Sequence, residues 1–217
     1  MKTLVLIRGW ASVGHSFKKL VISTPKDWQV VLIGADELIK NHDFDQAADN
    51  LEKIIKQKKI TDFILAGHSL GGAVAIAYSA KYPYSHSKLI LINTAGFPLP
   101  GSFYPETLKM FFRNSKKTVS HFSLKVREAM NLLKNPYFHL KLGKFAREAN
   151  IIYLAGKVTK PVLILYGNQD LLIPLQVAQE IKQSLPNARL KILKDLDHDW
   201  IQTHPDIFWQ EMKQISG

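Results

Sequence analysis

The chain has 217 residues, of which 46% are hydrophobic and 22% charged, and it contains no cysteine. This length and composition allow one domain with a buried core, whereas the absence of cysteine excludes disulfides, thiolate metal sites and a cysteine nucleophile. The 29 Lys and Arg residues outnumber the 18 Asp and Glu residues, and the net charge of +11 makes nucleic acid, an anionic membrane and an acidic protein candidate partners.

The first element expected along the chain is a short apolar strand over residues 3–8. Few apolar residues precede Arg8, and no small-residue cleavage site follows them. The segment is therefore too short for a signal peptide or a membrane span. We expect a cytoplasmic location and no transmembrane segment.

Further apolar, β-branched runs follow at residues 29–33, 62–66, 88–93, 161–166 and 189–193. Most of these runs are continuous rather than alternating, as expected of parallel strands that are buried on both faces. Stretches with helical spacing lie between them, among them residues 44–57 and 73–82. The alternation predicts an α/β fold with a mostly parallel six-stranded sheet flanked by helices.

The interval between the fourth and fifth expected strands is far longer than an ordinary connection. It contains one apolar helical face, formed by Val119, Phe122, Val126, Met130 and Leu133, and the Asn135-Pro136 pair should end that helix. We interpret residues 97–156 as an inserted helical cap. Residues 1–96 and 157–217 would then form the α/β core.

Residues 97–160 hold most of the excess charge, with twelve Lys and Arg residues against three Glu residues. They also contain ten of the 22 aromatic residues of the chain. A lysine-rich solvated surface over a small aromatic core explains both observations. The alternative is an acyl pocket beneath a surface that docks an anionic partner, because small-molecule sites are mainly apolar.

The tripeptide Gly-His-Ser occurs twice, and the two serines differ in context. Ser69 directly follows an expected strand, precedes an expected helix and lies in the pattern Gly67-x-Ser69-x-Gly71. Reactive residues of α/β sheets lie beyond the carboxyl ends of strands, and the glycines relieve crowding in a sharp turn that exposes the serine. Ser16 instead follows a loop and should lie in the first turn of a helix. We therefore predict Ser69 as the nucleophile.

A serine of ordinary pKa needs a general base, and the base needs an orienting carboxylate. Asp170 lies in the loop after the fifth expected strand, and His198 lies in the loop after the sixth. Because the carboxyl ends of parallel strands share one edge of the sheet, these loops can reach Ser69. We interpret the aspartates near this histidine, Asp195, Asp197 and Asp199, as solvated charges.

The chain is similar to α/β-hydrolase-fold serine esterases with a helical cap, which include carboxylesterases and pimeloyl-carrier-protein methyl ester esterases. The resemblance spans nearly the full length, through LIRGW, GHSLGG, GNQDLLIP and DHDWIQTHP, and the order Ser, Asp, His agrees with it. In such enzymes a proline follows the acid and the histidine at set spacings. Pro174 after Asp170 and Pro205 after His198 match them. These spacings favour His198 over His204, and they favour Asp170 over the alternatives Asp195, Asp197 and Asp199.

Two main-chain N–H groups should stabilise the oxyanion. Leu70 directly follows the nucleophile and would supply one of them, and the resemblance implies that Trp10 supplies the other. The chain departs from the family pattern at Arg8, where the family usually has histidine, and at residues 34–41, which lack the usual Pro-Gly loop. Arg8 should either place a cation at the pocket wall or turn outward.

Together these features predict an enzyme that hydrolyses carboxylic esters through an acyl-enzyme, with Ser69, His198 and Asp170 as the catalytic triad. Thioester cleavage, carbon–carbon bond hydrolysis and perhydrolysis use the same groups. The expected substrate is a small-molecule or carrier-bound acyl ester. The basic cap would dock an acidic protein, with an anionic membrane surface as the competing partner.

The alternative is a non-catalytic α/β-hydrolase-fold binding protein that uses the basic cap to hold an anionic partner. It predicts a missing triad member, and none is missing. No recognition motif indicates specific nucleic-acid binding. The histidines are dispersed, and no phosphate loop or dinucleotide fingerprint occurs, so we expect no metal and no cofactor.

Overall fold

The computed structural model describes residues 1–98 and 130–216 of the chain. Its strands form one parallel six-stranded sheet of order β2-β1-β3-β4-β5-β6. The strand bounds are β1 (Lys2–Arg8), β2 (Trp28–Gly34), β3 (Ile64–His68), β4 (Lys88–Ile92), β5 (Val162–Gly167) and β6 (Ala188–Leu193). The predicted α/β fold and sheet are confirmed. β3 lies two residues later than expected and ends directly before Ser69.

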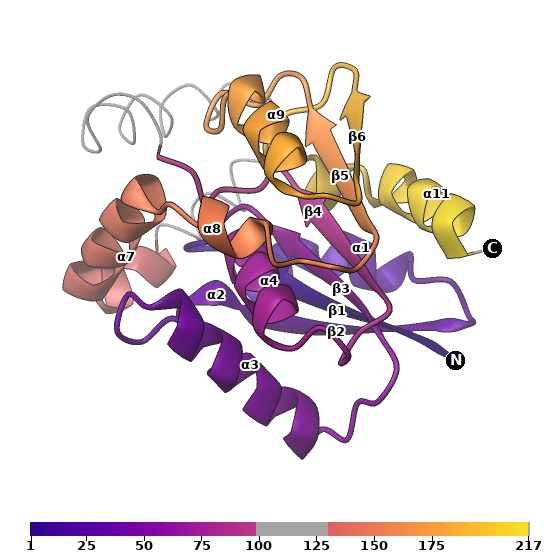
Figure 1. Cartoon of the computed structure of the whole chain (residues 1–217), viewed down its shortest axis with the longest axis horizontal. Helices are drawn as coiled ribbons and strands as arrows, with labels where there is room; N and C mark the ends of the chain where they lie inside the picture. The colour runs from indigo at the N-terminus through magenta and orange to yellow at the C-terminus, as the bar shows by residue number, and fades with distance from the viewer. Residues whose placement is uncertain (99–129, 217) are drawn as a thin grey trace.

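Helices cover both faces of the sheet (Figure 1). One face packs against α2 (Ala35–Leu38), α3 (Phe44–Gln57), α4 (Leu70–Lys81), α8 (Ile152–Ala155) and α9 (Leu175–Ser184). The other packs against η1 (Gly14–Phe17), α1 (Lys18–Ile22), α10 (Trp200–Thr203) and α11 (Pro205–Ser216). Alternate residues of β1 to β5 enter opposite cores, which is why these strands read as mostly apolar runs.

Helix α3 has the bounds that the sequence predicts, because its capping and its apolar spacing agree. The carboxylate of Asp43 accepts hydrogen bonds from the N–H groups of Asp45 and Gln46, which have no acceptor inside the helix. Its buried side chains recur at helical spacing and face α4 and the sheet: Phe44, Ala47, Ala48, Leu51 and Ile55.

Helix α7 (Pro136–Glu148) falls within the interval that we interpreted as a cap. The Asn135-Pro136 pair ends the helical residues 130–134, as predicted, and it also begins α7. Proline suits the first helical position, and the Asn135 side chain accepts a hydrogen bond from the N–H of Phe138. Phe145 of α7 packs on Phe44, with ring centroids 4.7 Å apart.

The apolar face predicted before α7 has two described members. Met130 and Leu133 are 60% and 74% exposed, so they do not form a buried face. Val119, Phe122 and Val126 lie outside the described residues. Across residues 1–98 and 130–216, the helices are too short or too polar to cross a membrane.

His86 is buried at the end of the sheet where β4 begins. Its two ring nitrogens lie 3.0 Å from Oγ of Ser79 and 3.2 Å from Oγ of Ser85. Burial, together with the positive charge of Lys160, lowers the pKa of His86 from 6.5 to about 4. The folded protein therefore holds this imidazole neutral under mildly acidic conditions.

We expect this histidine to make folding stability fall as the pH drops from about 6.5 to about 4. In that range the unfolded chain binds a proton that the folded chain does not, which should cost about 2 kcal/mol between about pH 7 and pH 5. Between these two pH values, the free energy of unfolding of His86→Gln should fall by about 2 kcal/mol less than that of the wild type. Urea unfolding of both proteins at the two pH values measures the difference. An equal loss in both would contradict the assignment.

Candidate active site

Ser69 occupies the sharp turn between β3 and α4. Its φ is +56° and its ψ is −126°, a strained combination for a residue with a side chain. The turn is held from outside: the N–H of Ser69 donates to the Ile92 carbonyl (3.0 Å), and its own carbonyl accepts from Gly72 (2.9 Å) and Ala95 (3.1 Å). Strain of this kind persists where the surrounding structure fixes the backbone.

The loop after β1 packs directly on this turn. A Cβ atom on Gly9 would lie 2.8 Å from Cβ of Ser69, and one on Gly71 would collide with the main-chain oxygen of Ile7. These glycines are required because two backbone segments meet without room for a side chain. The expected oxyanion loop is therefore a neighbour of the expected nucleophile.

Asp170 follows β5, and His198 lies in the loop between β6 and α10. Nδ1 of His198 lies 2.7 Å from Oδ2 of Asp170, and both side chains are buried. Oδ1 of the same carboxylate accepts hydrogen bonds from the N–H groups of Leu172 (2.8 Å) and Ile173 (3.0 Å). An ionised carboxylate fits this set of donors. With the proton of a neutral imidazole on Nδ1, the lone pair of His198 is on Nε2.

Asn93, the residue directly after β4, connects this pair to the rest of the core and was not predicted from the sequence. It is fully buried, and its Nδ2 donates to Oδ2 of Asp170 at 2.5 Å. Its Oδ1 accepts hydrogen bonds from Nε1 of Trp200 (2.8 Å) and from the N–H of Gly167 (3.2 Å). A polar residue ending the apolar run LILIN is the available sequence signal.

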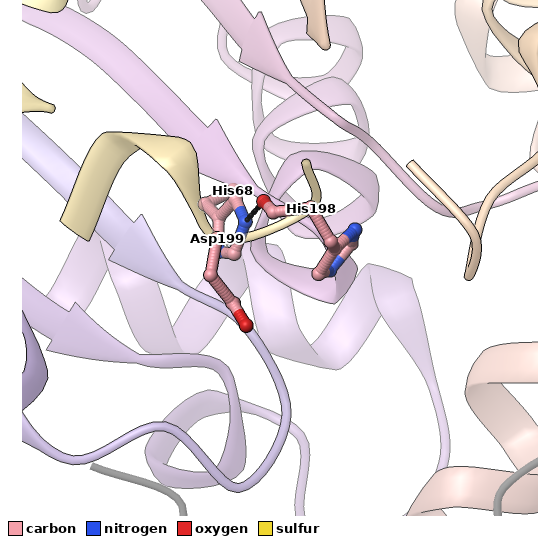
Figure 2. A group of neighbouring side chains, drawn as sticks. All are labelled: His68, His198 and Asp199. Atoms are coloured by element: carbon pink, nitrogen blue, oxygen red, sulfur yellow. Dashed lines mark hydrogen bonds between the residues drawn. The ribbon is translucent and has the colours of Figure 1, made fainter. Parts of the chain in front are cut away.

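His68, next to Ser69, links the β3–α4 turn to the His198 loop (Figure 2). Its Nε2 donates to the main-chain oxygen of His198 at 2.9 Å, and the two rings have centroids 4.8 Å apart. Burial, reinforced by His198, lowers the pKa of His68 to about 4. His68 is therefore neutral at pH 7 and adds no positive charge beside His198.

His68, His198 and Asp199 have potential ligand atoms within 4.8 Å of one another (Figure 2). Both imidazoles already make hydrogen bonds, since His68 Nε2 contacts a carbonyl and His198 Nδ1 contacts Asp170. Ligation would therefore have to use Nδ1 of His68 and Nε2 of His198, and the second of these is the atom expected to act as the general base.

The remaining predicted positions are the two expected oxyanion donors and the residues that were not assigned to the triad. Leu70 begins α4, where an N–H group has no intrahelical acceptor, and Trp10 is partly buried against the core. Ser16 is buried in η1, as expected of a serine in a first helical turn. Asp195 accepts a hydrogen bond from Gln169 and is exposed.

Asp199 corrects the interpretation of the nearby aspartates as solvated charges, because it is only 8% exposed. Its Oδ1 accepts a hydrogen bond from Nε2 of Gln202 at 3.3 Å. The residue directly precedes α10, and packing of that helix against α1 and η1 carries its side chain out of solvent.

Comparison with known proteins identifies a family whose model matches this chain. A family model described as alpha/beta hydrolase fold matches residues 2–124, which is more than half of the chain. The matched range includes the first four strands, the loop after β1 and the Ser69 turn.

Several proteins are similar over nearly the whole chain. The chain is 25% identical over 246 residues to the AB hydrolase superfamily protein YisY of Bacillus subtilis, covering 100% of this chain and 89% of that protein. It is 26% identical over 239 residues to the pimeloyl-[acyl-carrier protein] methyl ester esterase of Photobacterium profundum, covering 98% and 93%. The solved enol-lactonase from Burkholderia xenovorans has a TM-score of 0.80 at 17% identity, covering 98% and 90%.

Proposed function

The chain belongs to the α/β-hydrolase fold family and is a hydrolase of that superfamily, and from this premise we propose that it cleaves carboxylic esters through an acyl-enzyme formed on Ser69. The prediction of an enzyme, rather than a non-catalytic binding protein, is confirmed. The observation that carries the proposal is the buried 2.7 Å contact between His198 Nδ1 and Asp170, because it orients the imidazole and places the basic lone pair on Nε2.

In the proposed reaction, Nε2 of His198 accepts the hydroxyl proton of Ser69 while Oγ attacks the carbonyl carbon of the ester. The tetrahedral intermediate collapses, the bond to the alcohol breaks, and His198 gives its proton to the leaving alkoxide. A water molecule then attacks the acyl-enzyme, with His198 again as the base, and releases the acid. Asp170 stays ionised throughout and stabilises the imidazolium.

The oxyanion of each tetrahedral intermediate would be held by the main-chain N–H groups of Leu70 and Trp10. Leu70 lies at the positive end of α4, which favours developing negative charge. Trp10 follows Gly9, whose contact with Ser69 brings the loop to the nucleophile. Donors fixed in the backbone stabilise the transition state without reorganising during the reaction.

The finer proposal concerns the substrate, which we take to be an acyl ester carried by an acidic protein. Both cationic and apolar side chains are exposed on α7 and just before it: Leu133, Lys134, Tyr137, Leu140, Lys141 and Lys144. Nζ of Lys141 lies 4.3 Å from the centroid of the Tyr137 ring. These residues belong to the proposed cap, residues 97–156. The relative named as a pimeloyl-[acyl-carrier protein] methyl ester esterase supports this class of substrate.

Covalent labelling and turnover test the proposal together. A fluorophosphonate should attach to the wild-type protein, and mass spectrometry of its peptides should find the label on Ser69. p-Nitrophenyl esters from acetate to laurate should be hydrolysed, and the change in kcat/KM with acyl length would show how long an acyl chain the pocket accepts. A protein that resists the label and hydrolyses no ester would contradict the proposed chemistry.

A second set of substrates separates the candidate partners of the cap. An acyl methyl ester on acidic carrier protein should be turned over with a kcat/KM that falls as NaCl is added, because exposed charge pairs are screened by salt. Pantetheine bearing the same acyl ester is the matched control and should show little salt dependence. Equal salt dependence of both substrates would exclude docking of the carrier. Activation by vesicles of anionic phospholipid alone would favour a membrane surface instead.

A further inference from the structure

Arg8 is the last residue of β1 and directly precedes the glycine of the loop that carries Trp10. Its side chain is 9% exposed, so the expectation that it turns outward is wrong. Nη1 donates to the main-chain oxygen of Ser12 at 2.5 Å, and Nη2 donates to Oε1 of Glu37 at 2.7 Å. The guanidinium therefore joins the far end of this loop to the segment after β2.

The bond to Ser12 closes the loop around Trp10. Arg8 and Ser12 flank three residues, and Oγ of Ser12 donates across the same loop to the carbonyl of Gly9 at 2.8 Å. Within it, Ala11 has a φ of +61°, a conformation that is costly for a residue with a side chain. The hydrogen bonds at the ends of the loop offset that cost and hold its backbone.

The second contact of the Arg8 guanidinium, with Glu37, is fixed by the turn between β2 and α2. Oε1 of Glu37 also accepts a hydrogen bond from the N–H of Gly34 at 2.9 Å, and Gly34 lies beside Arg8 in the sheet. A Cβ on Gly34 would lie 2.9 Å from Nη2 of Arg8, so glycine leaves room for the pair. Because Glu37 is 56% exposed, solvent screens this attraction, and the buried charge-assisted bond to Ser12 is the stronger contact.

We propose that Arg8 is a positioning residue: by bonding to Ser12 from behind the loop, it holds the N–H of Trp10 where an oxyanion donor must lie. The proposal rests on the proposed function of this site. Both terminal nitrogens of Arg8 bond within the protein, so the fold itself holds the guanidinium in place. Loss of Arg8 should slow catalysis strongly even though Arg8 does not touch the reacting atoms, because displacing a catalytic group by about 1 Å can cost about 10²-fold in rate.

The test compares catalysis with the affinity of a tetrahedral mimic. Arg8→Met should lower kcat/KM for a p-nitrophenyl ester by about 10- to 100-fold, less than the loss of a whole oxyanion donor. A trifluoromethyl ketone, which forms a hemiketal oxyanion with the nucleophilic serine, should bind more weakly by the same factor. The primary alcohol of the same chain length, which is neutral and forms no hemiketal, should bind as before. Arg8→Lys retains the charge but lacks the two diverging donors, so it should show a smaller loss of both quantities.

Lys191→Met is the matched control for loss of an ion pair. Nζ of Lys191 lies 2.7 Å from Oε1 of Glu211, between β6 and α11, away from the loop. Its kcat/KM should stay within about twofold of wild type, because an ion pair remote from the site affects stability rather than the oxyanion. Circular dichroism and urea unfolding establish that each variant is folded. If Arg8→Met does not fold, Arg8→Lys decides the question.

Two results would overturn the role of Arg8. One is a folded Arg8 variant with wild-type turnover and wild-type affinity for the ketone. The other is a loss of turnover that the ketone does not share. Failure of the proposed function looks different, because the wild-type protein itself would then hydrolyse no ester and form no adduct with the ketone.

Discussion

Replacing Ser69 with alanine is expected to lower kcat for ester hydrolysis by about 10⁴- to 10⁶-fold, because the proposed acyl-enzyme forms on the hydroxyl that this change removes. Ser69 is in a strained turn, and the loop after β1 and the end of β4 both contact that turn. Turnover of a p-nitrophenyl ester, measured with and without prior fluorophosphonate treatment, provides the test. Any residual activity should be insensitive to the inhibitor.

The second Gly-His-Ser supplies the matched control. Ser16→Ala makes the same chemical change in the same local sequence, but Ser16 is 2% exposed and lies in η1. We expect Ser16→Ala to retain turnover within a fewfold and to be labelled as the wild type is. Full activity in Ser69→Ala, or loss of labelling in Ser16→Ala, would contradict the choice between the two serines. Urea unfolding of both variants excludes a loss of folding as the cause.

The sheet and helix α3 could be predicted from the sequence because local signals determine them. Continuous apolar runs marked the strands, and the spacing from Phe44 to Ile55 marked α3. The start of α4 was placed three residues late, since the sequence GHSLGG reads as a turn. In the structure, Leu70 already begins the helix, because the unusual backbone angles of Ser69 make the turn between strand and helix. The triad remains a prediction, placed by the rule that reactive groups follow strand ends.

The partners of these groups depend on contacts that are distant in sequence. Asn93 meets Asp170 only because β4 and β5 are neighbours, and Trp200 reaches Asn93 only because α10 packs behind the sheet. The sequence shows Arg8 as a departure from the family pattern, but the direction of its side chain depends on its bonds to Ser12 and to Glu37, which lies 29 residues later. Each case needs the sheet order and the loop conformations, which hydrophobic periodicity does not encode.

Asp170→Asn is expected to lower kcat by about 10⁴-fold while the fold is retained. The amide oxygen must take the place of Oδ1, because that atom accepts the N–H groups of Leu172 and Ile173. The new NH₂ group then faces Nδ2 of Asn93, also a donor, and Nδ1 of His198. The imidazole must turn its Nδ1 lone pair to this donor and carry its proton on Nε2. Nε2 can then no longer accept the proton of Ser69.

Asp195→Asn is the control for this change, since Asp195 is an exposed carboxylate in the same region and was the alternative nearest in sequence to β6. Its φ is +62°, which asparagine tolerates, so its turnover should match the wild type. Both variants should retain Ser69, and slow labelling by a fluorophosphonate should persist in Asp170→Asn at a reduced rate. Wild-type turnover in Asp170→Asn would mean that His198 is not the general base and that its buried contact with Asp170 only stabilises the fold. Slowed turnover with an intact far-ultraviolet spectrum would instead support the proton transfer that the proposed ester chemistry requires.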